Sequence, residues 1–81
     1  METVNDEQAM ANIAANLRIM RNGRSLYAVA KAAGTYPINI ARIEAGLHMP
    51  GAGLLSRIAE VLGTSVDRML ASPEKNSENA S

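Results

Sequence analysis

Residues 36–42 carry side chains that could recognise the edges of DNA bases. The stretch reads Tyr-Pro-Ile-Asn-Ile-Ala-Arg. In the major groove an asparagine amide matches adenine, an arginine guanidinium matches guanine, and an apolar side chain contacts the methyl group of thymine. If the stretch is helical, Ile38, Asn39 and Arg42 are available on its outer face. The full set of predicted base contacts is Tyr36, Pro37, Ile38, Asn39 and Arg42.

Each of these side chains also has a simpler interpretation. Tyr36 could contact a phosphate or pack against the protein, and Ile38 could lie in a protein interface or at the edge of the core. Asn39 could face solvent or a phosphate, and Arg42 could be a solvated arginine. Pro37 suits the first turn of a helix, because its φ angle is already set and it lacks an N–H that would otherwise be unpaired. It would stiffen the end of the helix that meets DNA.

Four further residues have the spacing that two steeply crossing helices require. Ala30 is small enough for the point of closest approach, and Gly34 allows the chain to reverse sharply. Ile40 and Ile43 would seal the joint from the second helix. This set is typical of a helix-turn-helix, in which the second helix enters the major groove of DNA.

The periodicity of apolar residues predicts an all-α fold with five helices and no strands. Ser25 is predicted to cap the second helix, Thr35 the third, and a capping box of Thr64 and Asp67 the fifth. The predicted helices span about residues 6–22, 25–33, 36–45, 51–62 and 64–70.

The composition allows one small domain and limits its chemistry. The chain has 81 residues, no cysteine and one histidine, which excludes disulfides, thiolate metal sites and a zinc site. Without a glycine-rich phosphate loop or paired acidic residues, we expect no enzymatic activity, no cofactor and no small-molecule ligand. No apolar run approaches the ~20 residues of a membrane span, and the acidic start is unlike a signal peptide. These features indicate a cytoplasmic protein.

The charges are unevenly distributed although they sum to zero. Residues 1–9 carry three acidic side chains and no basic one, residues 10–71 carry seven basic and three acidic ones, and residues 72–81 carry one basic and two acidic. We predict an acidic lead-in, a DNA-binding domain and a disordered polar tail over these three segments. The positive charge of the middle segment is modest for a DNA-binding domain, so it does not decide the function alone.

Two stretches of the sequence resemble the lambda-repressor-like family of the Cro/CI and Xre type. "SLYAVAKAAGTYPINIARIEAG" is similar to the family's run that ends in Ala-Gly and Ile-x-x-Ile-Glu-x-Gly. "LLSRIAEVLGTSVDRML" resembles its closing stretch, and the similarity spans residues 13–71. The resemblance implies five helices, binding of double-stranded DNA at a two-fold related operator, and a homodimer. It departs from the family at Leu26, where glutamine is common, and at the Thr35-Tyr36-Pro37 start of the third helix.

The resemblance also assigns roles outside the third helix. It implies that Glu44 pairs with an arginine of the first helix, and Arg18 is the predicted partner. Arg21 is a further cation that could contact phosphates. Main-chain N–H groups at the start of the fourth helix could also bind the DNA backbone. Each of these charges could instead be a solvated surface residue. The predicted contacts to the DNA backbone are Arg24, Ser25, Lys31, Thr35 and His48.

The fifth helix is the predicted site of association. Val66, Met69 and Leu70 are expected in a dimer interface, with burial of all three in the core as the alternative. The function predicted from the sequence is a repressor that binds a palindromic operator as a homodimer. The alternatives are an antitoxin that binds a toxin as well as DNA, and a protein-interaction module that uses Ile38 and Met49 as an apolar contact.

Overall fold

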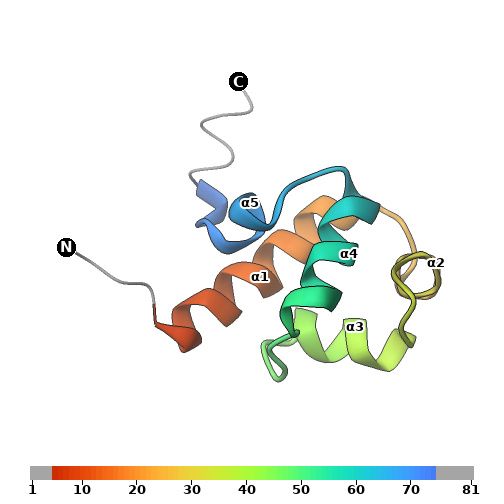
Figure 1. Cartoon of the computed structure of the whole chain (residues 1–81), viewed down its shortest axis with the longest axis horizontal. Coiled ribbons are helices and arrows are strands. Elements are labelled where there is room, and N and C mark those ends of the chain that lie inside the picture. The colour runs from red at the N-terminus through yellow and green to blue at the C-terminus, as the bar shows by residue number, and fades with distance from the viewer. Residues whose placement is uncertain (1–4, 75–81) are drawn as a thin grey trace.

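The computed structural model describes residues 5–74, and within this range the chain forms five helices and no strand. The predicted all-α fold is confirmed. In Figure 1, α2 and α3 lie toward one end of the molecule and α5 toward the other, and α1 runs along much of its length. Residues 1–4 and 75–81, which include most of the predicted tail, lie outside the described residues. The helices are α1 (Asp6–Arg21), α2 (Leu26–Ala33), α3 (Pro37–Glu44), α4 (Ala52–Leu62) and α5 (Val66–Leu70).

Side-chain caps fix where three of these helices begin. Asn5 accepts a hydrogen bond from the backbone N–H of Gln8 at the start of α1, and Ser25 accepts one from Ala28 at the start of α2. At α5 the cap is Ser65, whose hydroxyl accepts from the N–H of Arg68 at 3.1 Å.

Two of the predicted caps are wrong. Thr64 does not begin α5, because its backbone N–H donates to Ala59 and so closes the end of α4. Thr35 does not cap α3 either. The N-cap is Tyr36, which makes no side-chain capping bond, and Pro37 occupies the first turn without an N–H to satisfy.

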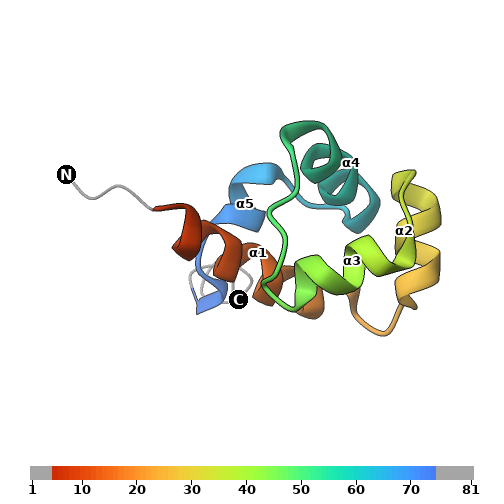
Figure 2. The same cartoon turned by 90° about the horizontal axis from the view of Figure 1, so that it is seen from below.

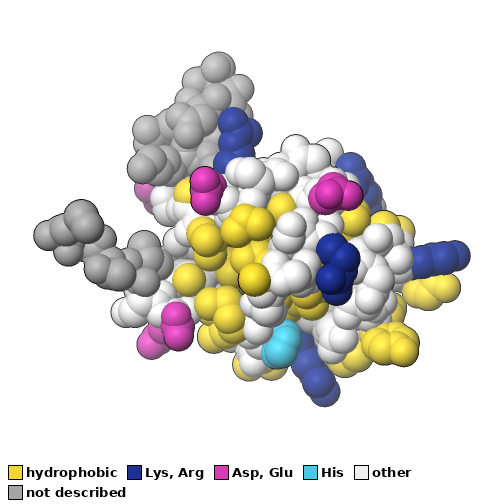
Figure 3. Space-filling model, in the orientation of Figure 1, with side chains coloured by type: hydrophobic (Ala, Val, Ile, Leu, Met, Phe, Trp, Pro, Cys, Tyr) yellow, Lys and Arg dark blue, Asp and Glu magenta, His cyan; other side chains and the backbone are white. Residues whose placement is uncertain are grey.

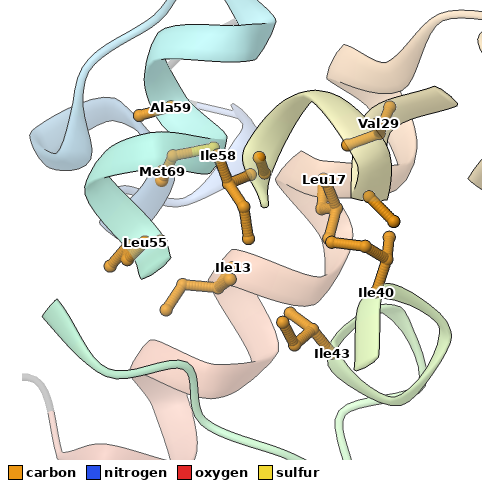
Figure 4. Close-up of a cluster of buried hydrophobic side chains, with 11 residues drawn as sticks. Ile13, Leu17, Val29, Ile40, Ile43, Leu55, Ile58, Ala59 and Met69 are labelled. Atoms are coloured by element: carbon orange, nitrogen blue, oxygen red, sulfur yellow. The ribbon is translucent and has the colours of Figure 1, made fainter. Parts of the chain in front are cut away.

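The core lies where α1, α2, α3, α4 and α5 meet, and it contains only aliphatic residues and methionine (Figure 4). Helix α3 packs against α1 and α2, whereas α5 packs against α1 and α4. Met69 has no exposed surface, so its predicted place in a dimer interface is wrong: the side chain points inward from α5. The buried cluster comprises Ile13, Leu17, Val29, Ala30, Ala33, Ile40, Ile43, Leu55, Ile58, Ala59 and Met69.

Two asparagines of α1 tie α5 to the rest of the fold. The buried Asn16 amide donates to the backbone carbonyls of Arg68, Met69 and Ala71 at 2.7–3.0 Å. Asn12 donates to the carbonyl of Leu70 at 2.9 Å. Carbonyl groups at a helix end lack partners within the helix, so these amides satisfy groups that burial would otherwise leave unpaired. The five-residue α5 is therefore held by hydrogen bonds as well as by Met69.

The turn between α2 and α3 is fixed by backbone hydrogen bonds. Gly34 has a φ angle of +74° and donates to the carbonyls of Ala30 and Lys31. The N–H of Thr35 also donates to Ala30, at 2.9 Å. Glycine adopts this left-handed conformation without strain from a Cβ atom, which lets the chain reverse directly after α2. From α4, the Nε of Arg57 donates to the carbonyl of Ala33 and braces the same turn.

Candidate nucleic-acid interface

The outward face of α3 carries the exposed side chains of the predicted base contacts. Figure 2 looks onto the side of the molecule on which α3 lies. Ile38 is 56% exposed, and Arg42, one turn further along, is exposed as well. Ile40 and Ile43 have no exposed surface and hold the opposite face of the helix against the core.

The N-terminal end of α3 projects a large polar aromatic side chain. Tyr36 is 73% exposed, while Pro37 and Asn39 are half-buried. The backbone carbonyl of Tyr36 accepts from the N–H of Asn39 at 2.9 Å, which closes the first turn. The amide of Asn39 donates to the hydroxyl of Thr35 at 2.8 Å. Tyr36, Ile38 and Arg42 are thus all exposed, with Ile38 and Arg42 one turn apart on the same face of α3, while Asn39 is half-buried.

The arginine that pairs with Glu44 is Arg21, not Arg18. The Nε and Nη2 groups of Arg21 donate to the two carboxylate oxygens of Glu44 at 2.7 and 3.1 Å. Arg18 donates instead to the backbone carbonyl of Glu44, because it lies one turn earlier on α1. The prediction of Arg18 as the ion-pair partner is therefore wrong. Both arginines nevertheless tie the end of α3 to α1.

The Arg21–Glu44 pair is bidentate and largely shielded from solvent. The side chain of Arg21 is 25% exposed and that of Glu44 is 11% exposed. Hydrogen bonding to Glu44 raises the pKa of the Arg21 guanidinium above its ordinary value. A third N–H of Arg21 donates to the carbonyl of Arg24 at 2.7 Å. Arg21 is thus committed to structure, which removes it from the candidate phosphate contacts.

A double-mutant cycle tests this assignment. We expect a coupling free energy between Arg21 and Glu44 of about 1–2 kcal/mol in urea unfolding, measured with Arg21→Gln, Glu44→Gln and the double variant. The matched cycle with Arg18→Gln should give less coupling, since Arg18 contacts the backbone of Glu44 and not its carboxylate. Stronger coupling of Glu44 to Arg18 would contradict the structure.

The predicted backbone contacts differ in their availability. Lys31 and His48 are exposed, whereas Arg24 donates to the carbonyl of Val61 at 2.8 Å. Ser25 is exposed, but its hydroxyl is engaged in capping α2. Thr35 is half-buried and accepts from Asn39.

The charge pattern favours the α2–α3 side of the molecule. Residues 18–57 contain six basic side chains and one acidic side chain, and that acidic residue is Glu44, which is paired with Arg21. In Figure 3, dark-blue Lys and Arg side chains lie mainly over the half that contains α2 and α3. The magenta acidic side chains lie near the start of α1 and along the upper edge. The half of the molecule with α2 and α3 is thus the more positive one in this view.

Two features outside α3, concerning Arg57 and Tyr27, were not anticipated from the sequence. Arg57 braces the turn before α3, and no motif distinguishes it from a solvated arginine. Tyr27 is 64% exposed, one helical turn before Lys31. Leu26, at the position where the family commonly has glutamine, is half-buried and packs against the core. The N-cap of α4 is Gly51, which provides no side-chain capping bond, so the first N–H groups of that helix have no side-chain acceptor there.

Other kinds of site find no support in the described part of the chain. Over residues 5–74, no group of three or more acidic or histidine side chains is arranged to hold a metal ion. None of the helices there is both long and apolar enough to cross a membrane.

Comparison with known proteins identifies the family. Residues 15–69 match the helix-turn-helix family model HTH_3. The fold is similar to the crystal structure of the hypothetical transcription factor NHTF from Neisseria, with a TM-score of 0.80, 22% sequence identity, and coverage of 98% of this chain and 94% of that one. No curated protein matches the sequence. Because the family model spans most of the chain, the protein belongs to the helix-turn-helix family of DNA-binding transcription regulators, of the lambda-repressor-like Cro/CI and Xre type that its sequence resembles.

Proposed function

We propose that the protein is a repressor that inserts α3 into the major groove of a palindromic operator. The observation that carries this proposal is the division of α3 into two faces. Ile40 and Ile43 are fully buried, while Ile38 and Arg42 are exposed on the outward side. A helix held in this way presents a fixed set of side chains to base edges at little cost in entropy.

The proposed base contacts follow from the chemistry of each side chain. Arg42 donates two hydrogen bonds to the O6 and N7 atoms of guanine, and Ile38 packs against a thymine methyl group. Asn39 reads adenine. Tyr36 and Pro37 lie at the start of the helix, where the tyrosine hydroxyl reaches a phosphate or the groove wall.

Contacts to phosphates position the protein without reading sequence. Lys31 and His48 are exposed beside the motif and are the strongest candidates. Arg24 and Ser25 have partners within the protein and would contribute through their remaining hydrogen-bonding groups, whereas the hydroxyl of Thr35 is engaged by Asn39. The N–H groups at the start of α4 add further donors.

We propose that a homodimer forms through the side of the molecule with α4 and α5. Val66 and Leu70 are half-buried, as are Leu54, Val61 and Leu62 of α4. Hydrophobic side chains gather over the region of α1, α4 and α5 in Figure 3. A two-fold contact there would separate two α3 helices by about one turn of DNA, roughly 34 Å. Sedimentation of the complex should give two chains per duplex, and a single chain per operator would contradict the dimer.

A gel-shift titration against genomic competitor DNA tests the function. The duplex is selected from random sequences by the protein, and binding is measured over a range of salt concentrations. If a dimer neutralises about six phosphates, log K should fall with log salt with a slope of about −5. The proposal predicts a steep slope, and it predicts that the protein stays bound to the selected duplex when competitor DNA is present. Binding without sequence preference, or without salt dependence, would contradict it.

A second candidate function is a protein-interaction module, and the exposed apolar side chains favour it. Leu47 is 77% exposed and Ile38 is 56% exposed, although Met49 is half-buried against the core. Such a module would bind its partner through this surface and bind DNA weakly. The same titration separates the two candidates, because only a DNA-reading protein gives both the steep slope and the sequence preference.

A further inference from the structure

We propose that Thr35 is a positioning residue that orients the amide of Asn39 for reading adenine. The inference rests on the proposed insertion of α3 into the major groove. It is supported by the hydrogen bond that Nδ2 of Asn39 donates to Oγ1 of Thr35, at 2.8 Å. This bond joins the turn to the first turn of α3. It assigns Thr35 a role different from the phosphate contact expected from the sequence.

The position of Thr35 is fixed because its backbone belongs to the turn. The N–H of Thr35 donates to Ala30 at 2.9 Å, and Gly34 sets the direction of the chain with its left-handed conformation. Ala30 has no exposed surface and lies in the core. The backbone of Thr35 is therefore anchored through the buried part of α2.

The bond leaves one edge of the Asn39 amide for DNA. An asparagine amide has two N–H donors and one carbonyl acceptor. One N–H is used by Thr35, so the carbonyl oxygen and the second N–H remain. Adenine requires this pair: its N6 amino group donates to the amide oxygen, and its N7 atom accepts from the amide N–H.

Without the bond, the amide would be less selective. The terminal torsion of asparagine is broad and roughly two-fold, so a free amide can turn and exchange its donor and acceptor. The NH2 group then faces outward and suits the O6 and N7 acceptors of guanine. Holding Nδ2 against Thr35 keeps the oxygen of Asn39 available. Thr35 thus acts on base selection through Asn39 and without touching the base.

Operator variants measure this selection directly. The full chain is titrated with the selected operator and with versions in which each base pair of one half-site is replaced. The titration with Asn39→Ala identifies the base pair at which this variant has lost its base preference. At that base pair, Thr35→Val should lower the preference for adenine by about threefold to tenfold. Binding to non-specific DNA and the salt slope should remain unchanged. Thr35→Ser retains the hydroxyl and should retain the preference, and Thr35→Val should have no further effect on it in the Asn39→Ala background.

Three results would overturn the proposal. Equal weakening on operator and non-specific DNA, with a shallower salt slope, would make Thr35 a phosphate contact. An Asn39-dependent preference for guanine would mean that the NH2 group faces outward. If Thr35→Val preferred adenine as strongly as the natural protein does, Thr35 would have no positioning role.

A measurement on the free protein keeps this inference separate from the proposed function. In nuclear magnetic resonance spectra, the two side-chain amide protons of Asn39 should differ from those of a solvated amide. In Thr35→Val, but not in Thr35→Ser, the chemical shifts of these two protons should move toward the values of a solvated amide. Identical amide signals in all three proteins would overturn the positioning role even if no operator were found. Failure to bind any duplex, with the predicted amide signals present, would contradict only the proposed function.

Discussion

Ile40→Ala is expected to lower the free energy of unfolding by about 2–5 kcal/mol. Ile40 has no exposed surface and packs in the cluster formed with α1 and α2. Truncation removes buried methyl and methylene groups and leaves a cavity that the surrounding helices fill only in part. Urea unfolding followed by far-ultraviolet circular dichroism measures the change, since the chain contains no tryptophan.

Ile38→Ala is the matched control, because it makes the same substitution two residues away on the same helix. Ile38 is 56% exposed, so the unfolding free energy should change by about 0.5 kcal/mol or less. Its effect should appear instead on DNA, where we expect a loss of about 1 kcal/mol of operator affinity from the missing apolar contact. If Ile38→Ala destabilised the fold as much as Ile40→Ala, the assigned orientation of α3 would be wrong.

Arg42→Ala is expected to weaken operator binding by about 1–3 kcal/mol for each half-site, with loss of guanine preference at one base pair. Arg42 is exposed on the outward face of α3, one turn after Ile38. A guanidinium donates two parallel hydrogen bonds to the O6 and N7 atoms of guanine, and the methyl side chain of alanine donates none. Titration of the operator and of its single-base variants measures both the affinity and the preference.

Arg42→Lys separates the charge of this side chain from its shape. Lysine retains the positive charge but lacks the planar fork that makes two hydrogen bonds in fixed geometry. The lysine variant should therefore keep the salt dependence of the natural protein and lose much of the guanine preference. A uniform loss of affinity across all sequences in Arg42→Ala would instead indicate a phosphate contact.

Much of the fold follows from local features of the sequence. The apolar spacing predicted all five helices, and Asn5 and Ser25 cap the helices whose starts they mark. The cap of α5 was wrong because two acceptable residues stand side by side. Thr64 and Ser65 can both cap a helix, and the choice depends on the end of α4, which uses the N–H of Thr64.

Interactions between distant elements were harder to anticipate. Either Arg18 or Arg21 could reach Glu44 from α1, and only the packing of α1 on α3 decides that Arg21 meets the carboxylate. Asn16 was overlooked because an asparagine among alanines on a helix gives no sign that it will bond the end of α5. Met69 illustrates the same difficulty, since α5 is too short for its spacing to distinguish an inward side chain from an interface.

The candidate site was predicted as a set of residue types, while its internal organisation required the structure. The spacing of Ile40 and Ile43 indicated which face of α3 turns inward, and this left Ile38 and Arg42 outside. The bond between Thr35 and Asn39 depends on the geometry of the turn and on a side-chain conformation. A residue pattern alone does not specify either of them.

A crystal structure of the protein with the DNA duplex that it selects from random sequences tests the central claim most directly. The predicted result is α3 in the major groove, with the side chains of Ile38 and Arg42 against base edges and those of Ile40 and Ile43 still in the core. A duplex bound to another surface of the protein, or α3 turned away from the bases, would contradict the account.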